Sequence, residues 1–406
     1  MSFNIALSGL NAATADLGTI SNNIANANTT GFKQSRTEFG DLFRRSSYET
    51  NGAASGAGVQ VARVAQQFDQ GTINNTGKAL DLAISGDGFF TLSDDGARVY
   101  SRSGSFGTDR SGYVVNAAGQ RLQVYPPQAT GTTFNTGQLV DLRLSSNTNP
   151  PAATRNIEAG INLPANATPP TSSTFSPTDS NSYNKTTSIT VYDSLGSPHT
   201  ASLYFAKTAD AGSWNLYTTI DGNTVGNPVA LQYDSSGTLT TPANGIATLD
   251  AMPLSNGASP LSLALDIGSA TQYGDSFSIG TLTQDGYATG ELGGLSVTEE
   301  GIVQARFTNG QVTNVGQLAM ASFANSQGLQ ELGNSSWAET YASGQVVLGV
   351  AGGPGFGAVQ AGALEASNVD LTEQLVSMMS AQRNYQANSQ VISATDQLLQ
   401  QIMNLR

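Results

Sequence analysis

The sequence predicts an α+β fold that is mainly β, with one long helix at each end of the chain. Near both ends, apolar residues recur in alternating steps of four and three, which is the spacing of an amphipathic helix with a heptad seam. Between the ends, short runs that alternate Val, Ile, Phe and Tyr are separated by turns rich in Gly, Asn and Asp. With 406 residues, of which 45 are Gly and only 12% are charged, the chain is long enough for two or three domains.

The C-terminal segment predicts a helix over residues 369–404. Ser367 or Asn368 is expected to cap its start, and Asp370 and Glu373 place negative charge on its first turn, where the helix dipole favours it. Such a helix is roughly 54 Å long at ~1.5 Å per residue, so it needs a partner to pack against. Its seam consists of Leu371, Leu375, Met378, Tyr385, Ile392, Leu399 and Ile402.

The N-terminal segment has the same spacing, and its helix is expected to end near Asn26. Two arrangements fit the two seams: a helical hairpin within one chain, or packing of the helices along copies of themselves. The other faces of both helices carry mostly Asn, Gln, Ser, Thr and Ala, whereas a lone exposed helix usually carries charge. We therefore favour self-association. The N-terminal seam consists of Phe3, Leu7, Leu10, Leu17, Ile20 and Ile24.

Several stretches between the helices predict β-hairpins, in one of which Asn309-Gly310 forms the turn. Residues 126–183 contain several Pro among Thr, Ser and Asn, which predicts extended connectors rather than helices or central strands. Residues 34–43 predict a short amphipathic turn through Phe39, Leu42 and Phe43, and residues 51–58 predict a flexible segment. The clearest hairpin stretches are residues 78–96, 99–125, 188–207 and 295–323.

Composition excludes several classes of function. The net charge of −13 argues against nucleic acid as a partner, because phosphate contacts need clustered Lys and Arg. No apolar run reaches the ~18–20 residues that span a bilayer, so no membrane insertion is expected. The absence of Cys excludes disulfides and thiol chemistry, and suits an extracellular bacterial protein, although some cytosolic proteins also lack Cys. The first residues lack the basic and apolar regions of a cleaved signal peptide, so an exported chain would need another exporter.

No catalytic, cofactor or metal site is expected. His199 is the only histidine, and no carboxylate or Ser stands at a recognised spacing from it. Residues 71–79 resemble a phosphate-binding loop only superficially, because five residues rather than four separate the glycines and Ala79 replaces the hydroxyl residue. Scattered Asp residues leave a calcium ion open as an alternative, although nothing demands one. Two acidic pairs precede a Gly in predicted turns and are read as solvated loops: Asp94-Asp95 and Glu299-Glu300.

Three motifs resemble those of the bacterial flagellar rod and hook family. SGLNAA at residues 8–13 and NNIANANTTGFK at residues 22–33 resemble the family's N-terminal signature, and residues 368–406 resemble its C-terminal segment equally closely. Residues 78–96 resemble the central signature. The motif residues singled out are Asn22, Asn23, Asn26, Gly31 and Phe32.

The resemblance implies two antiparallel β domains nested inside a terminal two-helix coiled-coil domain. Glycines in two segments are the expected hinges between the helical and β parts: Gly52, Gly56, Gly58, Gly352 and Gly353. The implied parts are an inner helical domain (1–30 with 364–406), a connecting segment (31–70), a middle β domain (71–145 with 285–363) and an inserted outer β domain (146–284).

The resemblance also implies a function. It predicts a structural subunit, not an enzyme, that polymerises into the curved hollow tube of the flagellar hook and acts as a universal joint between rod and filament. A length near 400 residues favours the hook over the shorter rod subunits. The implied partners are the chain itself, the rod, the hook cap, the hook-length ruler, the hook–filament junction proteins and the flagellar type III export apparatus. The alternatives are a distal rod or junction subunit, or a secreted β-rich carbohydrate-binding protein.

Overall fold

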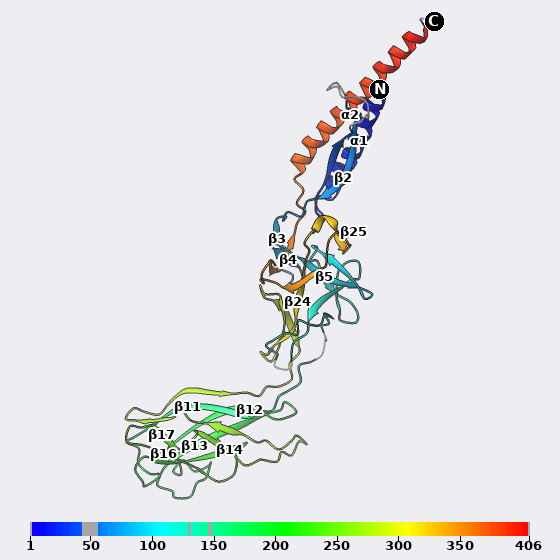
Figure 1. The fold of residues 1–406 in the computed structure, drawn as a ribbon. Helices are drawn as coiled ribbons and strands as arrows, with labels where there is room; N and C mark the ends of the chain where they lie inside the picture. The colour runs from blue at the N-terminus through cyan, green and yellow to red at the C-terminus, as the bar shows by residue number, and fades with distance from the viewer. Residues whose placement is uncertain (1, 43–55, 129–130, 145–147, 405–406) are drawn as a thin grey trace. The chain divides into compact units, whose positions relative to one another are not determined.

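The computed structural model describes residues 2–42, 56–128, 131–144 and 148–404 and divides into two compact units (Figure 1). The first unit contains Met1–Ser146, Gly294–Arg306 and Val312–Arg406, and the second contains Asn147–Gly293 with Phe307–Gln311. The second unit is thus inserted into the first, and the domain bounds expected from the sequence stay a prediction. The further division of the first unit into helical and middle domains stays a prediction. The mainly β fold with a helix at each end is confirmed.

The two terminal helices lie side by side in the first unit (Figure 1). Helix α1 spans Ser2–Ala25, and α2 spans Leu371–Asn404. They run antiparallel, since Asn23 near the end of α1 contacts Gln374 near the start of α2. Asp370 caps the start of α2, in place of the expected Ser367 or Asn368. Its carboxylate accepts hydrogen bonds from the amides of Thr372 (2.8 Å) and Glu373 (3.2 Å).

Residues 35–66 contain a hairpin where a turn and a connecting segment were expected. Strand β1 (Ser35–Asp41) pairs antiparallel with β2 (Val59–Gln66). The hairpin packs along α1, where the Thr37 hydroxyl donates to that of Thr19 at 3.0 Å. The turn prediction was wrong because Ser-Arg-Thr-Glu-Phe-Gly-Asp shows no apolar alternation: its inward side chain is Thr37, not a large apolar residue. Phe43 lies outside the described residues.

The β part of the first unit is built on a twelve-stranded sheet, with two short strand pairs beside it. Its core includes Phe90, Leu92, Leu122 and Met320, and a second cluster surrounds Trp337. The large sheet consists of β5 (Phe89–Asp94), β6 (Ala97–Ser101), β7 (Gly107–Thr108), β8 (Val114–Val115), β9 (Arg121–Tyr125), β10 (Val140–Asp141), β22 (Leu292–Val297), β23 (Ile302–Phe307), β24 (Val312–Ser322), β25 (Gln330–Gly333), β26 (Ser336–Ala338) and β27 (Val347–Val350). The short pairs are β3 (Ile73–Asn75) with β29 (Ala363–Glu365), and β4 (Leu82–Ser85) with β28 (Ala358–Ala361); a 3₁₀ turn spans Ser326–Gly328.

The second unit is a sandwich of a five-stranded and a six-stranded sheet that share one apolar core. Trp214, Phe205 and Leu265 are among its most deeply buried side chains. The five-stranded sheet consists of β11 (Asn156–Pro164), β18 (Ile246–Thr248), β19 (Ala264–Asp266), β20 (Thr271–Tyr273) and β21 (Ser278–Gln284). The six-stranded sheet consists of β12 (Lys185–Tyr192), β13 (Pro198–Lys207), β14 (Ser213–Ile220), β15 (Asn223–Thr224), β16 (Val229–Tyr233) and β17 (Leu239–Thr241).

Strand β11 corrects two expectations. It lies within residues 126–183, which were expected to be connectors, yet it is a central strand whose Ile157, Ala159, Ile161 and Leu163 face the core. It also pairs parallel with β19 and β20, so the unit is not purely antiparallel. The entry and exit of the unit are joined by bridges between Asn149 and Gly290 and between Ala152 and Tyr287.

Candidate self-assembly surface

The contact between the two helices uses small and polar side chains. Gly9 comes so close to Asn388 that a Cβ atom at Gly9 would lie 2.6 Å from the amide oxygen of Asn388. Asn23 donates to the side-chain oxygen of Gln374 at 3.1 Å, and both residues are buried. The other buried side chains of the pair are Ala6, Ala12, Ala13, Ile20 and Ala381. Small residues allow close approach of the two backbones, but they bury little apolar surface.

The large apolar residues of the predicted seams mostly lie elsewhere. Of the N-terminal set, only Ile20 is buried; Leu10, Leu17 and Ile24 are half-buried, and Phe3 and Leu7 are exposed. Of the C-terminal set, Met378 and Ile392 are half-buried, and the exposed members are Leu371 (46%), Leu375 (51%) and Tyr385 (39%). The side chains of Leu399 and Ile402 lie outside the described residues. The intramolecular hairpin therefore leaves much of each seam free.

Further apolar side chains that the seams did not include are exposed on the same elements. Sequence reasoning missed Val61 and Val64 and placed Phe39 in a turn, because the hairpin that presents them was not predicted; Phe39 and Val61 are direct neighbours across the two strands. All large apolar side chains that are exposed on the described parts of α1 and α2, inside or outside the predicted seams, form what we call the apolar helix surface: Phe3, Ile5, Leu7, Leu371, Leu375, Val376, Met379, Tyr385, Val391, Leu398 and Met403. Exposed apolar side chains in such number on one pair of helices are typical of a surface that binds protein.

The family-motif residues lie at the end of α1 and connect this helix to the rest of the first unit. The amide group of Asn26 donates to the side chain and backbone carbonyl of Asn22, which closes the last turn of the helix. Asn23 accepts from the Ser35 amide at 2.9 Å and donates to the Ser35 carbonyl at 2.8 Å. Gly31 has a φ of +68°, and a Cβ atom there would lie 2.5 Å from the Ser103 nitrogen, so only Gly fits. Phe32 is half-buried.

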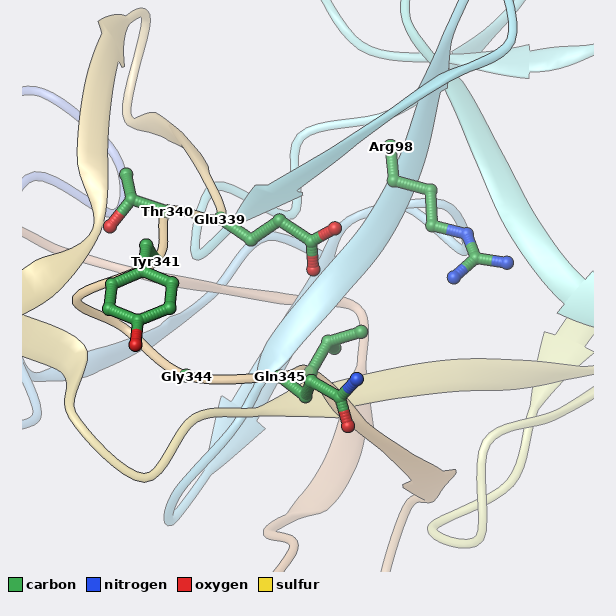
Figure 2. Close-up of a pocket in the computed structure, with 7 residues that line it drawn as sticks. Arg98, Glu339, Thr340, Tyr341, Gly344 and Gln345 are labelled. Carbon is green, nitrogen blue, oxygen red and sulfur yellow. The ribbon is translucent and has the colours of Figure 1, made fainter.

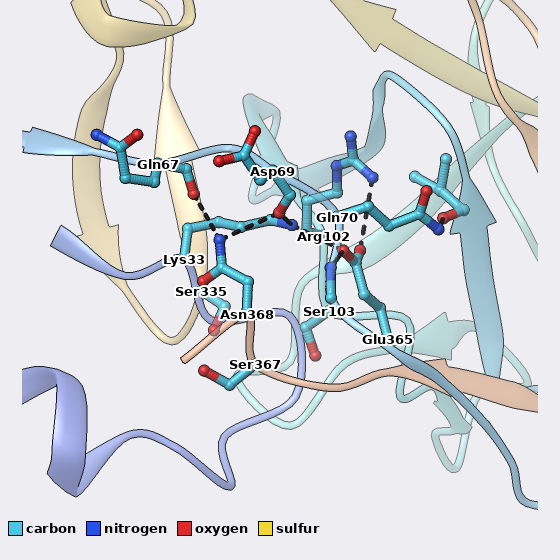
Figure 3. A network of polar contacts seen from close by, with 12 residues as sticks. Lys33, Gln67, Asp69, Gln70, Arg102, Ser103, Ser335, Glu365, Ser367 and Asn368 are labelled. Carbon is cyan, nitrogen blue, oxygen red and sulfur yellow. Dashed lines mark hydrogen bonds and ion pairs between the residues drawn. The ribbon is translucent and has the colours of Figure 1, made fainter. Parts of the chain in front are cut away.

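Next to the motif, Lys33, Arg102 and Glu365 form a buried charge cluster (Figure 3). The Lys33 ammonium donates to one oxygen of Glu365 at 2.7 Å, and the Arg102 guanidinium lies 3.5 Å from the other oxygen. The side chains of Lys33 and Glu365 are 0% exposed. Burial lowers the pKa of Lys33, against the pull of Glu365, and burial likewise lowers the pKa of Arg102. Sequence reasoning missed this cluster because its members are far apart in the chain.

The expected hinge glycines occupy different kinds of site. Gly52 lies outside the described residues, Gly56 is exposed, and Gly58, with a φ of +117°, directly precedes β2. Gly352 and Gly353 lie in the turn between β27 and β28, held by hydrogen bonds from Gly352 to Gly357 and from Gly353 to Val350. Strands β28 and β29 stand between these two glycines and α2 in the chain. A hinge role for these glycines stays a prediction.

His199 has the carboxylate partners that its sequence spacing did not indicate. Its Nδ1 lies 2.6 Å from Asp221 and its Nε2 lies 3.3 Å from Asp193, both in the second unit. Burial alone would lower the pKa of His199, but the hydrogen bonds to Asp221 and Asp193 outweigh burial and raise this pKa. The imidazole thus joins two turns, and it has no nucleophile beside it among its described contacts.

A concavity of about 860 Å³ is present in the first unit (Figure 2). It is lined by Arg98, Glu339, Thr340, Tyr341, Gly344, Gln345 and Val346. The Tyr100 hydroxyl donates to Glu339 at 3.3 Å, and Tyr341 is fully exposed. These side chains provide no pairing of a nucleophile with a base. Within the part of the chain that the structure describes, no three His, Asp or Glu side chains gather as a metal site would require, and no helix has the length and apolar character to cross a bilayer.

Four family models match successive parts of the chain. "Flagella basal body rod protein" matches residues 3–33, "Flagellar hook protein FlgE/F/G D1 domain" matches residues 83–176, "Flagellar basal body protein FlaE D2 domain" matches residues 162–287, and "Flagellar basal body rod FlgEFG protein C-terminal" matches residues 360–405. These matches cover both terminal segments and both β regions.

Similar proteins span the same full length. The chain is 40% identical to the flagellar hook protein FlgE of Escherichia coli and 38% identical to that of Salmonella typhimurium, in both cases over 100% of each chain. The crystal structure of the Helicobacter pylori flagellar hook protein FlgE2 has the same fold, with a TM-score of 0.52 at 13% identity, over 72% of this chain and 100% of that one. From these similarities, this chain belongs to the flagellar hook protein FlgE family.

Proposed function

We propose that this chain polymerises through the apolar helix surface into the hollow, curved tube of the hook. As a member of its family it is a structural subunit of the bacterial flagellar hook, and that family is not a family of enzymes. The observation that carries the proposal is that the buried side chains of the two helices are Ala, Asn, Gln and one Ile, whereas Leu, Met, Val and Tyr side chains are exposed. A second copy of the chain can cover these side chains and supply the missing burial.

The geometry of polymerisation follows from the same surface. A head-to-tail contact whose rotation does not close produces an open helical filament. Helices of about 24 and 34 residues are long enough to line such a tube along its axis. The helix pair of a free chain is then only weakly stabilised, because its interface buries little apolar area against the entropy of ordering it. We expect both helices to become fully ordered only in the tube.

The β units supply the outer contacts of the tube and the properties of a universal joint. Polar surfaces exchange hydrogen-bond partners at low net cost, so neighbouring subunits can shift against each other while torque passes from rod to filament. The further partners proposed are the rod, the hook cap, the hook-length ruler, the hook–filament junction proteins and the flagellar export apparatus. The proposed location is outside the cell, in the hook.

The test replaces an exposed apolar residue of α2 by a charged one. Leu375→Asp should abolish polymerisation measured by light scattering and electron microscopy, whereas Asn384→Asp, an exposed polar position of the same helix, should polymerise like the unchanged chain. Circular dichroism of the unchanged chain should show helix content rising with polymer. Normal polymerisation of Leu375→Asp would exclude the apolar helix surface as the assembly contact, and a chain that never polymerises would favour the secreted binding protein.

A further inference from the structure

The buried charge cluster joins three segments of the first unit that are distant in sequence. Lys33 follows α1, Arg102 follows β6, and Glu365 ends β29, just before α2. Two cations and one carboxylate meet there (Figure 3). We propose that the cluster is an ordered latch: the segment that carries Glu365 must seat on the β part first, and only then can the segment that carries Lys33, together with α1, dock.

Glu365 has its own partners in the absence of Lys33. Its carboxylate accepts from the Gly71 amide at 2.9 Å and faces the Arg102 guanidinium, which is also held by the Gly86 carbonyl at 2.9 Å. Its backbone pairs with Ile73 in the β3–β29 ladder. A carboxylate with a cation and an amide as partners can be buried without Lys33. The C-terminal segment can therefore seat alone.

Lys33 lacks this independence. Without Glu365, the ammonium keeps one hydrogen-bond partner among the described residues, the Asp69 carbonyl at 2.7 Å. The Arg102 charge lies close enough to oppose the Lys33 charge, and the attraction of the exposed Asp69 carboxylate is weak in comparison. Burying an ammonium beside a like charge and without a counter-ion is strongly unfavourable. The carboxylate of Glu365 is thus a precondition for burying Lys33.

The backbone contacts of the N-terminal segment have the same dependence. The Gly31 amide donates to the Glu365 carbonyl at 2.9 Å, and the Gln34 amide donates to the Asn368 side chain at 2.8 Å. Within α1, the side chain of Asn23 donates to the side-chain oxygen of Gln374. In each of these three contacts the acceptor belongs to the C-terminal segment. The N-terminal segment also touches the β part, where the Ser335 hydroxyl donates to the Thr30 carbonyl at 3.2 Å.

The test is hydrogen exchange followed by mass spectrometry on the full-length chain, before and after polymerisation. The variants are Glu365→Gln, Lys33→Met and the double variant, with Arg36→Met, an exposed Arg of β1, as the control. Glu365→Gln should speed exchange at residues 29–37 at least tenfold, in addition to residues 363–366. Lys33→Met should leave residues 363–366 protected. The double variant should exchange more slowly at residues 29–37 than Glu365→Gln alone, because Met can be buried without a counter-ion, but faster than the unchanged chain, because Glu365→Gln still leaves Arg102 without its carboxylate.

Peptides of β13 in the second unit serve as the internal reference, because their hydrogen exchange should not change in any variant. Unchanged exchange at residues 29–37 in Glu365→Gln would overturn the latch. So would a Lys33→Met variant that exposes residues 363–366 as strongly as Glu365→Gln exposes residues 29–37. The latch is a property of the single chain, so light scattering on the same samples separates its failure from failure to polymerise.

Discussion

The terminal helix pair and the β-sandwich of the second unit differ in the kind of side chain that each buries. The sandwich buries its large side chains, with Trp214, Leu203 and Leu265 at 0% exposure, between two sheets of its own. The helix pair buries Ala and polar amides and leaves Leu375 and Met379 half exposed. A full Leu or Phe side chain contributes about 1.5–3 kcal/mol on burial, so the sandwich is complete by itself and the helix pair is not.

The largest expected effect is a loss of stability in the β-sandwich of the second unit. Phe205→Ala removes a side chain that is 1% exposed and should lower the free energy of unfolding of the second unit by about 3–5 kcal/mol. Chemical denaturation followed by tryptophan fluorescence measures it, since Trp214 lies in the same core. Tyr341→Ala, a fully exposed position, is the control. A loss below about 1 kcal/mol would contradict a self-sufficient sandwich.

The next effect probes the closeness of the two helices. Ala381 is 2% exposed, so Ala381→Leu forces extra atoms into the contact and should destabilise the helix pair by about 1–3 kcal/mol. Circular dichroism of the polymer during thermal melting detects the loss, with Ser380→Leu on the exposed side as the control. Equal melting of the two variants would mean that the helices are not in close contact at Ala381.

A smaller effect depends on pH and tests whether the sandwich carries a protonated histidine. The pKa of His199 is raised in the folded chain by Asp221 and Asp193, despite burial. Its contribution to stability is therefore fully present below the unfolded pKa of about 6.5 and is lost as pH rises through the higher folded pKa. The second unit should lose stability over that range, and His199→Gln should remove this dependence.

The chain has a single histidine, so the imidazole signals followed by proton NMR all come from His199. At the acid end, hydrogen bonds from Asn256 and the Ser197 amide, against burial, lower the pKa of Asp193 to about 2. That contribution is present above the unfolded pKa of Asp and is lost as pH falls toward the folded value. A His199 signal that titrates at or below about 6.5 would contradict the paired geometry.

The smallest expected effect on the stability of the free chain comes from an exposed apolar residue of α2, and it tests most directly whether the helix pair needs a second chain. Leu371→Ala removes an exposed side chain, so it should change the unfolding free energy by less than about 0.5 kcal/mol. The same variant should raise the protein concentration at which polymers form, because the proposed assembly contact covers Leu371 with a neighbouring subunit. Thr372→Ala, also exposed, is the matched control. Equal polymerisation of the two variants would remove Leu371 from the assembly surface.

The parts that sequence predicted well are those with local patterns. Heptad spacing located both helices, and turns such as Asn309-Gly310 located hairpins such as β23–β24. Strand β1 was missed because its inward residue is Thr37, and β11 because prolines around it outweighed its own alternation. The pairing of Lys33 with Glu365 joins positions 332 residues apart, so no local pattern predicts it.

The joined ends of the second unit have a consequence for how such chains diversify. Its entry and exit are bridged at Asn149–Gly290 and Ala152–Tyr287, so the two segments of chain that lead into and out of Asn147–Gly293 are held together. A domain inserted in this way can lengthen, shrink or be exchanged without changing the distance between the two residues that flank it. A tag or a change of length in the second unit is therefore expected to leave the terminal helices in place.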